Sequence, residues 1–287
     1  MSQPFALSLV IPAFNESDRL GGTLSTVFDY LGGEPYASEV IVVDDGSTDG
    51  TARVAEESFA AAGPRTEPRV LRYEPNRGKG HAVRAGLLAA RARVAVFSDA
   101  DLSTPITEMP KLTGPIRAGE YDVVFGSRAL DPTLVGVHQS WRREQSGRFF
   151  NLVMRAATGL PYVDTQCGFK AFRMDVCRPV VEGACIDRFG FDVELLYVAH
   201  AAGLRLYERP VRWNDVAGSK VTLRAGLDGF LELRELRRQA RAGVYDEAVR
   251  RAREIAATPD ARAPLPLGDA PARTDASPEL VGAERRI

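Results

Sequence analysis

Residues 94–101 read Val94-Ala95-Val96-Phe97-Ser98-Asp99-Ala100-Asp101 and place two carboxylates directly after a short apolar run. The run Val94–Phe97 predicts a buried strand, so Asp99 and Asp101 would lie at its carboxyl end. In open α/β sheets, ligands bind at that edge. Alternate residues of an extended segment point the same way, so both carboxylates can reach one hard divalent cation. Most D-x-D sequences are solvated loop carboxylates. Whether these two bind a metal ion or are such loop carboxylates is therefore judged from the other motifs of the chain.

Short apolar runs alternate with segments of helical spacing through the first half of the chain. The runs are Leu7–Ile11, Val40–Val43, Val70–Tyr73, Val94–Phe97 and Asp122–Phe125, and the helical segments between them are Ser17–Leu31, Asp49–Ala62, Gly80–Ala90 and Thr107–Arg117. Near-continuous apolar strands separated by helices predict an α/β fold, with a mostly parallel, Rossmann-like sheet and helices on both faces.

The alternation of apolar runs and helical segments becomes less regular after Gly126. We expect a long loop at Asp131–Gln145, a helix at Gly147–Thr158, a strand at Cys167–Arg173, a helix at Phe191–Ala202 and a strand at Leu204–Val211. From Leu223 to about Ala257 the chain has helical spacing and many arginines, with an apolar stripe that predicts an amphipathic C-terminal helical extension. Residues 258–287 are rich in Pro, Ala and Asp, which predicts a disordered tail. The expected division is therefore a domain at 1–222, the extension at 223–257 and the tail at 258–287.

The composition is that of an ordinary globular protein, with 45% hydrophobic and 26% charged residues among 287. A net charge of -1 argues against a nucleic-acid partner, because such proteins normally carry a basic surplus. The N-terminal residues lack a signal-peptide pattern, and no apolar run reaches the roughly 18 residues that a membrane span needs. Three cysteines without zinc-type spacing fit free thiols in a reducing cytosol, so we expect a cytoplasmic protein.

Polar side chains also follow the first two predicted strands. The first strand ends in Ile11-Pro12-Ala13-Phe14-Asn15-Glu16, and the second in Val42-Val43-Asp44-Asp45-Gly46-Ser47-Thr48-Asp49-Gly50. Carboxylates at this edge can accept hydrogen bonds from a nucleobase or from ribose hydroxyls. Each segment is also an ordinary turn or helix cap, but three carboxylate-bearing strand ends in one sheet favour a binding site.

Two common nucleotide-binding motifs are missing after the first strand. Neither G-x-G-x-x-G nor G-x-x-x-x-G-K-[ST] occurs there, which argues against a dinucleotide-binding domain and a P-loop enzyme. Asn76-Arg77-Gly78-Lys79-Gly80, after the third strand, suits the rim of a phosphate or sugar site and equally suits a glycine-rich helix entry.

Together these residues resemble the family-2 glycosyltransferases of GT-A fold, in particular the dolichyl- or polyprenyl-phosphate β-glucosyltransferases. The matching segments, in the family's order, are Ile11–Glu16, Val43–Thr51, Asn76–Gly80, Asp99–Asp101, Gly126–Arg128, Asp164–Lys170, Phe191–Leu196 and Trp213–Lys220. The early segments are shared by many family-2 enzymes, whereas D-T-Q-C-G-F-K and the later ones are much more specific.

The resemblance implies a role for individual residues. Nucleotide-sugar contacts fall on Pro12, Ala13, Phe14, Glu16, Val42, Asp44, Asp45, Lys79, Asp99, Ala100, Gln166 and Lys220. Asp101, Arg128 and Asp192 would be catalytic, and Asp99 and Asp101 would flank Mg²⁺ or Mn²⁺ at the diphosphate. The implied reaction is inverting transfer of glucose, or a close hexose, from a nucleotide sugar to a polyprenyl or dolichyl phosphate. The resemblance favours UDP-glucose as the donor.

The acceptor determines which further groups the reaction needs. A lipid phosphate is already an anion and needs cations rather than a strong base, and Arg142, Arg143 and Arg148 are candidates for that cradle or form a solvated basic face. A hydroxyl of a small molecule would need a carboxylate base, for which Asp192 is the best candidate. A non-catalytic nucleotide-sugar sensor is a third interpretation, which the intact Asp99 and Asp101 disfavour.

The arginine-rich extension bears on location and assembly. Arg224, Arg234, Arg237, Arg238 and Arg241 flank its apolar stripe and could meet anionic headgroups, giving peripheral contact with the cytosolic face of a membrane. Packing of the stripe on the domain, or on a second subunit of a homo-oligomer, explains the pattern as well.

Overall fold

A seven-stranded sheet forms the centre of the computed structural model, which describes residues 5–137, 151–216 and 223–267. The strand order is β3 (Thr66–Tyr73), β2 (Ser38–Asp45), β1 (Leu7–Ala13), β4 (Val94–Ser98), β7 (Phe169–Arg173), β5 (Val123–Ser127) and β8 (Leu206–Pro210). Only β7 runs antiparallel to its neighbours β4 and β5 within this sheet. The prediction of a mostly parallel sheet is confirmed.

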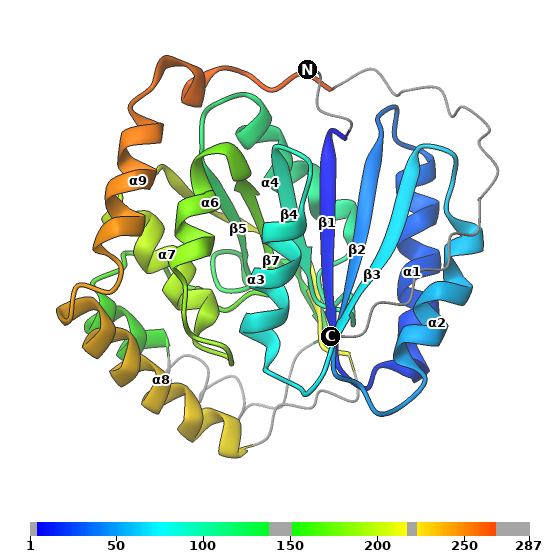
Figure 1. Cartoon of the computed structure of the whole chain (residues 1–287), viewed down its shortest axis with the longest axis horizontal. Helices are drawn as coiled ribbons and strands as arrows, with labels where there is room; N and C mark the ends of the chain where they lie inside the picture. Colours follow the sequence, from blue (N-terminus) through cyan, green and yellow to red (C-terminus); the bar gives the residue numbers. More distant parts are fainter. Residues whose placement is uncertain (1–4, 138–150, 217–222, 268–287) are drawn as a thin grey trace, which may run out of the picture.

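Helices cover both faces of the sheet (Figure 1). They are α1 (Ser17–Gly32), α2 (Thr51–Ser58), α3 (Lys79–Ala89), α4 (Met109–Arg117), α6 (Met174–Gly183), α7 (Phe191–Ala201), α8 (Leu223–Arg241) and α9 (Asp246–Ala256). Residues 151–158 are also helical, and short 3₁₀ turns occupy Phe59–Ala61, Ile106–Glu108, Pro132–Leu134 and Pro259–Arg262.

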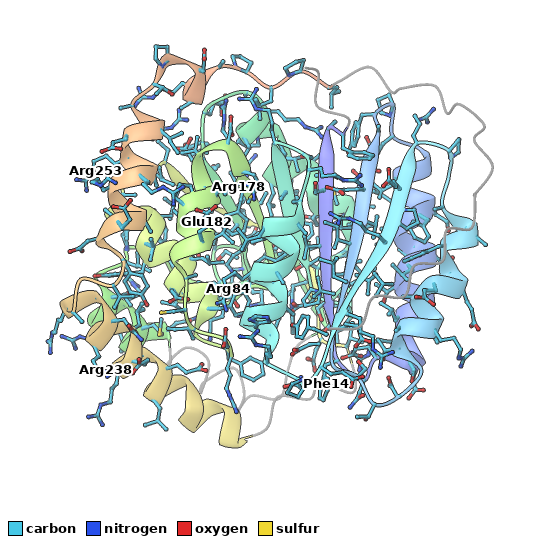
Figure 2. All side chains as sticks on the ribbon, in the orientation of Figure 1. Phe14, Arg84, Arg178, Glu182, Arg238 and Arg253 are labelled. Carbon is cyan, nitrogen blue, oxygen red and sulfur yellow. The ribbon has the colours of Figure 1, made fainter. Side chains whose placement is uncertain are left out.

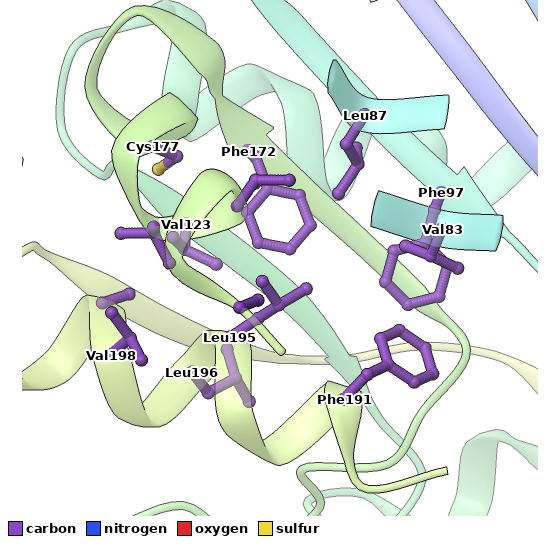
Figure 3. Close-up of a cluster of buried hydrophobic side chains, with 14 of the residues drawn as sticks. Val83, Leu87, Phe97, Val123, Phe172, Cys177, Phe191, Leu195, Leu196 and Val198 are labelled. Atoms are coloured by element: carbon purple, nitrogen blue, oxygen red, sulfur yellow. The ribbon is translucent and has the colours of Figure 1, made fainter. Parts of the chain in front are cut away.

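Alternation along the strands divides the core into two layers. Val10, Val43 and Phe97 belong to one buried cluster, together with side chains of α3, α6, α7 and α9. Leu9 and Val42 belong to the other, together with side chains of α1 and α4. In the first layer the rings of Phe97 and Phe172 stack with centroids 6.5 Å apart (Figure 3). This two-sided burial explains why the strands are apolar at nearly every position.

The predicted loop at Asp131–Gln145 contains a strand. Residues Val135–Val137 form β6, which pairs in parallel with β9 (Trp213–Asn214) in a separate two-stranded sheet. A three-residue strand with a partner far along the chain has too little periodicity to be read from sequence. The remainder of this predicted loop, from residue 138, lies outside the described residues.

The predicted C-terminal helical extension is not continuous. It consists of α8 and α9, separated at Gly243, whose φ of +73° suits glycine. Leu233 and Leu236 are buried in the first core layer, as are Tyr245, Ala248 and Ala252. The described part of the stripe therefore packs on the domain, so these leucines do not enter a bilayer.

The beginning of the predicted disordered tail is ordered. Ala261 and Leu265 are buried, and the Leu265 amide donates to the Arg117 carbonyl at 2.8 Å. The Asp260 carbonyl accepts a hydrogen bond of 3.0 Å from the Arg173 guanidinium. Composition predicted disorder here because few large apolar residues are present, but two buried side chains and these backbone contacts hold the segment on the domain. The described helices include none that is long and apolar enough to cross a bilayer.

Candidate active site

The site lies where three neighbouring strands end. β1 pairs with β2 on one side and with β4 on the other, all in parallel, so their carboxyl ends meet at one edge of the sheet. The chain leaves β1 for β2 and later returns to its other side at β4, which makes this a topological switch point. A pocket of about 450 Å³ opens at this edge.

The pocket brings together many of the predicted residues. It is lined by Pro12, Ala13, Phe14, Glu16, Asp45, Lys79, Asp99, Ala100 and Asp101 from that set. Figure 2 shows Phe14 at the lower edge of the molecule, below the end of β1. Asn76, Arg77 and Gly78, from the segment that the sequence analysis offered as a phosphate or sugar rim, also line it. Four lining residues were not singled out from the sequence: Arg19, Ala82, Arg188 and Phe189. For Arg188 and Phe189 the available signal was a charged and an aromatic residue separated only by Gly190 from the Phe191–Leu196 segment.

Hydrogen bonds fix the loops after β1 and β2 to one another. The Asn15 amide donates to Ser47 Oγ at 2.9 Å, and the Thr48 amide donates to Asn15 Oδ1 at 2.8 Å. The next amide along the chain, that of Glu16, donates to Thr51 Oγ1 at 2.8 Å. The strand ends therefore hold Pro12–Glu16 rigidly along the pocket wall.

Asp45 organises the turn after β3. Its carboxylate accepts from the amides of Arg77 and Gly78 at 2.8 and 2.9 Å, and from Asn76 Nδ2 at 2.8 Å. Gly78 has a φ of +111°, and a Cβ there would lie 2.4 Å from the Asp187 carbonyl oxygen. The turn therefore requires glycine at 78, and it delivers Lys79 to the pocket.

The two carboxylates of the D-x-D segment have different surroundings. Lys79 Nζ lies 2.6 Å from Asp99 Oδ1, and a Cβ on Gly168 would lie 2.1 Å from Asp99 Oδ2. Asp101 Oδ1 accepts a 2.9 Å hydrogen bond from the Ser103 amide across Leu102, whose φ is +47°. Asp99 therefore lies between Lys79 and Gly168, the residue directly before β7. Asp101 instead accepts a hydrogen bond from the turn that follows it.

Lys79 stays charged in this setting. Burial favours the neutral amine, but the carboxylates of Asp99, Asp192 and Asp101 outweigh that effect and raise the pKa of Lys79. A permanent ammonium therefore stands beside the D-x-D carboxylates.

Asp192 lies behind the pocket rather than in its lining. Lys170 Nζ is 2.5 Å from Asp192 Oδ1 and 2.6 Å from the Cys167 carbonyl oxygen. Both side chains are buried, and burial raises the pKa of Asp192 against the opposing charges of Lys170 and Lys79. The structure therefore pairs the predicted catalytic carboxylate with a lysine.

Arg128 is also engaged by a carboxylate. Its Nε and Nη2 donate to the two oxygens of Asp164 at 2.7 and 2.8 Å, a bidentate pair. Although burial favours the neutral acid, the Arg128 guanidinium lowers the pKa of Asp164. The Arg128 guanidinium also lies 5.7 Å from the Trp213 ring centroid. Arg128 is absent from the pocket lining.

The remaining predicted residues have other positions. Val42 is fully buried in the second core layer, and Asp44 accepts from the Ser47 amide at 3.0 Å, so neither lines the pocket. The Gln166 side chain does not line it either. Lys220, Arg142, Arg143 and Arg148 lie outside the described residues.

The D-x-D carboxylates suit a hard divalent cation that shares its ligands with a substrate. Among the described residues, no three His, Cys, Asp or Glu side chains gather around a common point. Mg²⁺ is commonly held by one or two carboxylates together with substrate phosphates and water. Asp101 fits that arrangement best, because the Lys79 ammonium already neutralises Asp99.

Sequence comparisons agree with this geometry. The family model described as "Glycosyl transferase family 2" matches residues 8–180, more than half of the chain. The chain is 37% identical over 246 residues to the dolichyl-phosphate beta-glucosyltransferase of Drosophila melanogaster, covering 80% of this chain and 75% of the relative. The human protein of the same name is 33% identical over 227 residues, covering 75% of this chain and 69% of the relative.

Solved structures show the same fold. Glucosyl-3-phosphoglycerate synthase from Mycobacterium tuberculosis superposes with a TM-score of 0.58 at 20% identity, covering 81% of this chain and 79% of that one. Mannosyl-3-phosphoglycerate synthase from Rubrobacter xylanophilus gives a TM-score of 0.54 at 18% identity, covering 83% and 75%. The fold is GT-A, and the chain belongs to glycosyl transferase family 2.

Proposed function

We propose that the protein transfers glucose from UDP-glucose to a polyprenyl phosphate of the dolichyl type, with inversion at the anomeric carbon. The names of the curated relatives, dolichyl-phosphate beta-glucosyltransferases, support this acceptor and sugar. The M. tuberculosis neighbour was crystallised with Mn²⁺ and UDP-glucose, which supports the donor class. The observation that carries the proposal is the pocket that gathers Asp45, Lys79, Asp99 and Asp101 at one sheet edge.

The pocket offers separate regions for the parts of the donor. Pro12, Phe14 and Glu16 form the wall for the nucleoside, where an apolar surface and a carboxylate can meet a base and a ribose. Lys79, Arg77 and Arg188 supply positive charge for the diphosphate. Asp101 would hold Mg²⁺ or Mn²⁺ together with phosphate oxygens. When bound, the ion supplies positive charge that stabilises the departing diphosphate.

The chemistry at the sugar needs no strong base. An oxygen of the acceptor phosphate attacks the anomeric carbon, the bond from that carbon to the diphosphate oxygen breaks, and UDP leaves with the bonding electrons. A phosphate oxygen is already anionic near neutral pH. Arg142, Arg143 and Arg148 remain the proposed cradle for that phosphate.

The rival acceptor, a hydroxyl group, would need Asp192 as its base. A general base must reach the proton that it removes. Asp192 is buried, is held by Lys170 at 2.5 Å and does not line the pocket. These contacts favour the phosphate acceptor over the hydroxyl.

A lipid acceptor requires contact with a membrane. Phe14, Leu130, Val137 and Phe189 are exposed large apolar residues on loops or short strands that follow the sheet's carboxyl edge or line the pocket. We propose that this edge, rather than the buried leucines of α8, makes the peripheral contact with the cytosolic membrane face.

An assay with radiolabelled UDP-glucose and a short polyprenyl phosphate tests the proposal. We expect label in the organic extract, its loss with EDTA, and its return when excess Mg²⁺ or Mn²⁺ is added. Nuclear magnetic resonance of the product should show the β anomer from the α-linked donor. Binding of UDP-glucose without any labelled lipid would refute the acceptor, and label that persists in EDTA would refute the metal.

A further inference from the structure

The segment from Cys185 to Gly190 connects the C-terminal helices to the donor pocket. Two of its residues, Arg188 and Phe189, line the pocket. Its backbone also packs on the first turn of α3, where the His81 amide donates to the Asp187 carbonyl at 3.1 Å. A Cβ on Gly80 would lie 2.5 Å from the Ile186 carbonyl oxygen, so the two backbones are in close contact. We call residues 185–190 the pocket loop.

The first end of the pocket loop is held by a buried carboxylate. Glu194 on α7 is fully buried and accepts from the Cys185 amide at 2.8 Å and from the Ile186 amide at 3.0 Å. The same carboxylate accepts from the Tyr245 hydroxyl at 2.7 Å, and Tyr245 immediately precedes α9. Because water is excluded here, these hydrogen bonds are worth more than exposed ones.

The second end is held by α8. Glu232 Oε2 accepts a 2.6 Å hydrogen bond from the Gly190 amide, directly before α7 begins. A Cβ on Gly190 would lie 3.0 Å from the Glu232 Cβ, so α8 approaches the loop backbone closely. In Figure 1, α8 lies beside the lower edge of the molecule, where β1 and β2 also end.

We propose that Glu232 and Tyr245 are positioning residues that hold the pocket loop in the conformation that binds the nucleotide sugar. This inference rests on the proposed function. It implies that the packing of α8 and α9 determines the affinity for the nucleotide sugar, because both helices hold the pocket loop. If a fraction of the protein has the loop displaced, the apparent donor affinity falls by that fraction. Once donor fills the pocket, the loop is restored and the chemical step proceeds as before.

Substitutions at the two contacts test the proposal with matched controls. Glu232→Ala removes the acceptor of the Gly190 amide, whereas Glu232→Gln keeps an oxygen there and should rescue much of the effect. Tyr245→Phe removes one hydroxyl and keeps the ring. Glu235→Ala is the control, because Glu235 lies one turn further along α8, is half-buried and pairs with Arg238 rather than with the loop.

The readouts separate positioning from general stability. In Glu232→Ala we expect the Kd for UDP with Mn²⁺, by calorimetry, and the KM for UDP-glucose to rise about five- to twentyfold. The kcat at saturating donor should stay within about twofold of wild type. Tyr245→Phe should shift both constants in the same direction by about threefold. Loss of folded protein would instead lower the apparent kcat and leave Kd and KM unchanged.

Hydrogen exchange reports on the loop itself. The amides of Cys185, Ile186 and Gly190 should exchange faster in Glu232→Ala than in Glu235→Ala, and saturating UDP should restore their protection. Unchanged Kd, KM and exchange in both Glu232→Ala and Tyr245→Phe would overturn the inference. Failure of the wild-type protein to bind UDP would instead overturn the proposed function.

Discussion

Only Ala100 separates Asp99 from Asp101, yet the two carboxylates have different surroundings. Asp99 is paired with the Lys79 ammonium at 2.6 Å and packs against Gly168. Asp101 is oriented by one backbone amide, that of Ser103. Of the two, Asp101 is therefore the carboxylate that we propose holds a cation together with the substrate.

Asp101→Ala should lower glucose transfer by at least about 100-fold while leaving the fold intact. The reason is that the pocket loses the carboxylate proposed to hold the metal at the diphosphate. Transfer rates and thermal melting, measured side by side, check this. The control is Asp29→Ala, an exposed carboxylate in α1. Transfer within about threefold of wild type in Asp101→Ala would contradict the assignment.

The pair between Arg128 and Asp164 predicts a pH-dependent stability. Arg128 lowers the pKa of the buried Asp164, so the pair stabilises the fold above the unfolded pKa of about 3.9. That contribution is lost as pH falls through the lower folded pKa. We expect Asp164→Asn to cost about 2 to 4 kcal/mol at pH 7, because it leaves the guanidinium without its counter-charge.

Urea unfolding of wild type and Asp164→Asn from pH 7 downward measures this difference. The gap between the two proteins should be constant above about pH 5 and should shrink at more acidic pH. A gap that widens on acidification, or no gap at pH 7, would show that the pair does not stabilise the fold.

Some residues of the pocket could be predicted from the local sequence, whereas others reach it only through tertiary packing. The D-x-D segment and the P-A-F-N-E segment could be predicted because each follows a strand directly. The Val42 side chain does not line the pocket, because alternation in β2 turns it into the layer under α1 and α4. Arg188 reaches the pocket through the packing of its loop on α3, and no sequence period encodes such a contact.

At the level of elements, the close packing of α3 on the sheet has a sharp test. A Cβ on Gly86 would lie 2.2 Å from Val10 Cγ1 and 2.9 Å from Val43 Cγ2. Gly86→Ala should therefore destabilise the protein by about 1 to 3 kcal/mol through overpacking.

Gly22 in α1 is the matched control, because a Cβ there meets nothing within 4 Å. Gly22→Ala should stabilise the protein by about 0.5 to 1 kcal/mol, since alanine loses less conformational freedom in a helix. Denaturant midpoints of both variants test the contrast. Equal effects of the two substitutions would show that α3 does not approach the sheet so closely.

The long regular elements could be predicted from sequence, whereas the short and late ones could not. Strands β1, β2 and β4 are apolar throughout because both faces are covered, and this is a strong signal. β6 and β9 are too short for a period, and the interruption between α8 and α9 rests on one glycine. The order at Leu265 depends on a contact with Arg117, far away in the sequence.

For the whole molecule, the C-terminal helices are part of the core rather than an appendage. Leu233, Leu236 and Tyr245 share a buried cluster with Phe97 and Phe172. A chain ending at residue 222 should therefore fail to fold, because each large buried side chain that it loses contributes about 2 to 5 kcal/mol. The loss of three such side chains is comparable with the whole stability of a typical domain, about 5 to 15 kcal/mol.

Circular dichroism and size-exclusion chromatography test that prediction. A chain ending at residue 267 is the control and should melt like the full-length protein, because it keeps α8, α9 and the segment packed on Arg117. A monomeric chain of residues 1–222 with a cooperative thermal transition would contradict this account of the core.

The most direct test of the central claim compares two lipid acceptors that differ in one group. Polyprenyl phosphate and the free polyprenol of equal length are offered to the full-length protein with labelled UDP-glucose and Mg²⁺. The account predicts labelled lipid with the phosphate and none with the alcohol, because Asp192, the base that a hydroxyl acceptor would need, is buried, paired with Lys170 and absent from the pocket lining. Equal labelling of both lipids, or labelling of the alcohol alone, would contradict it.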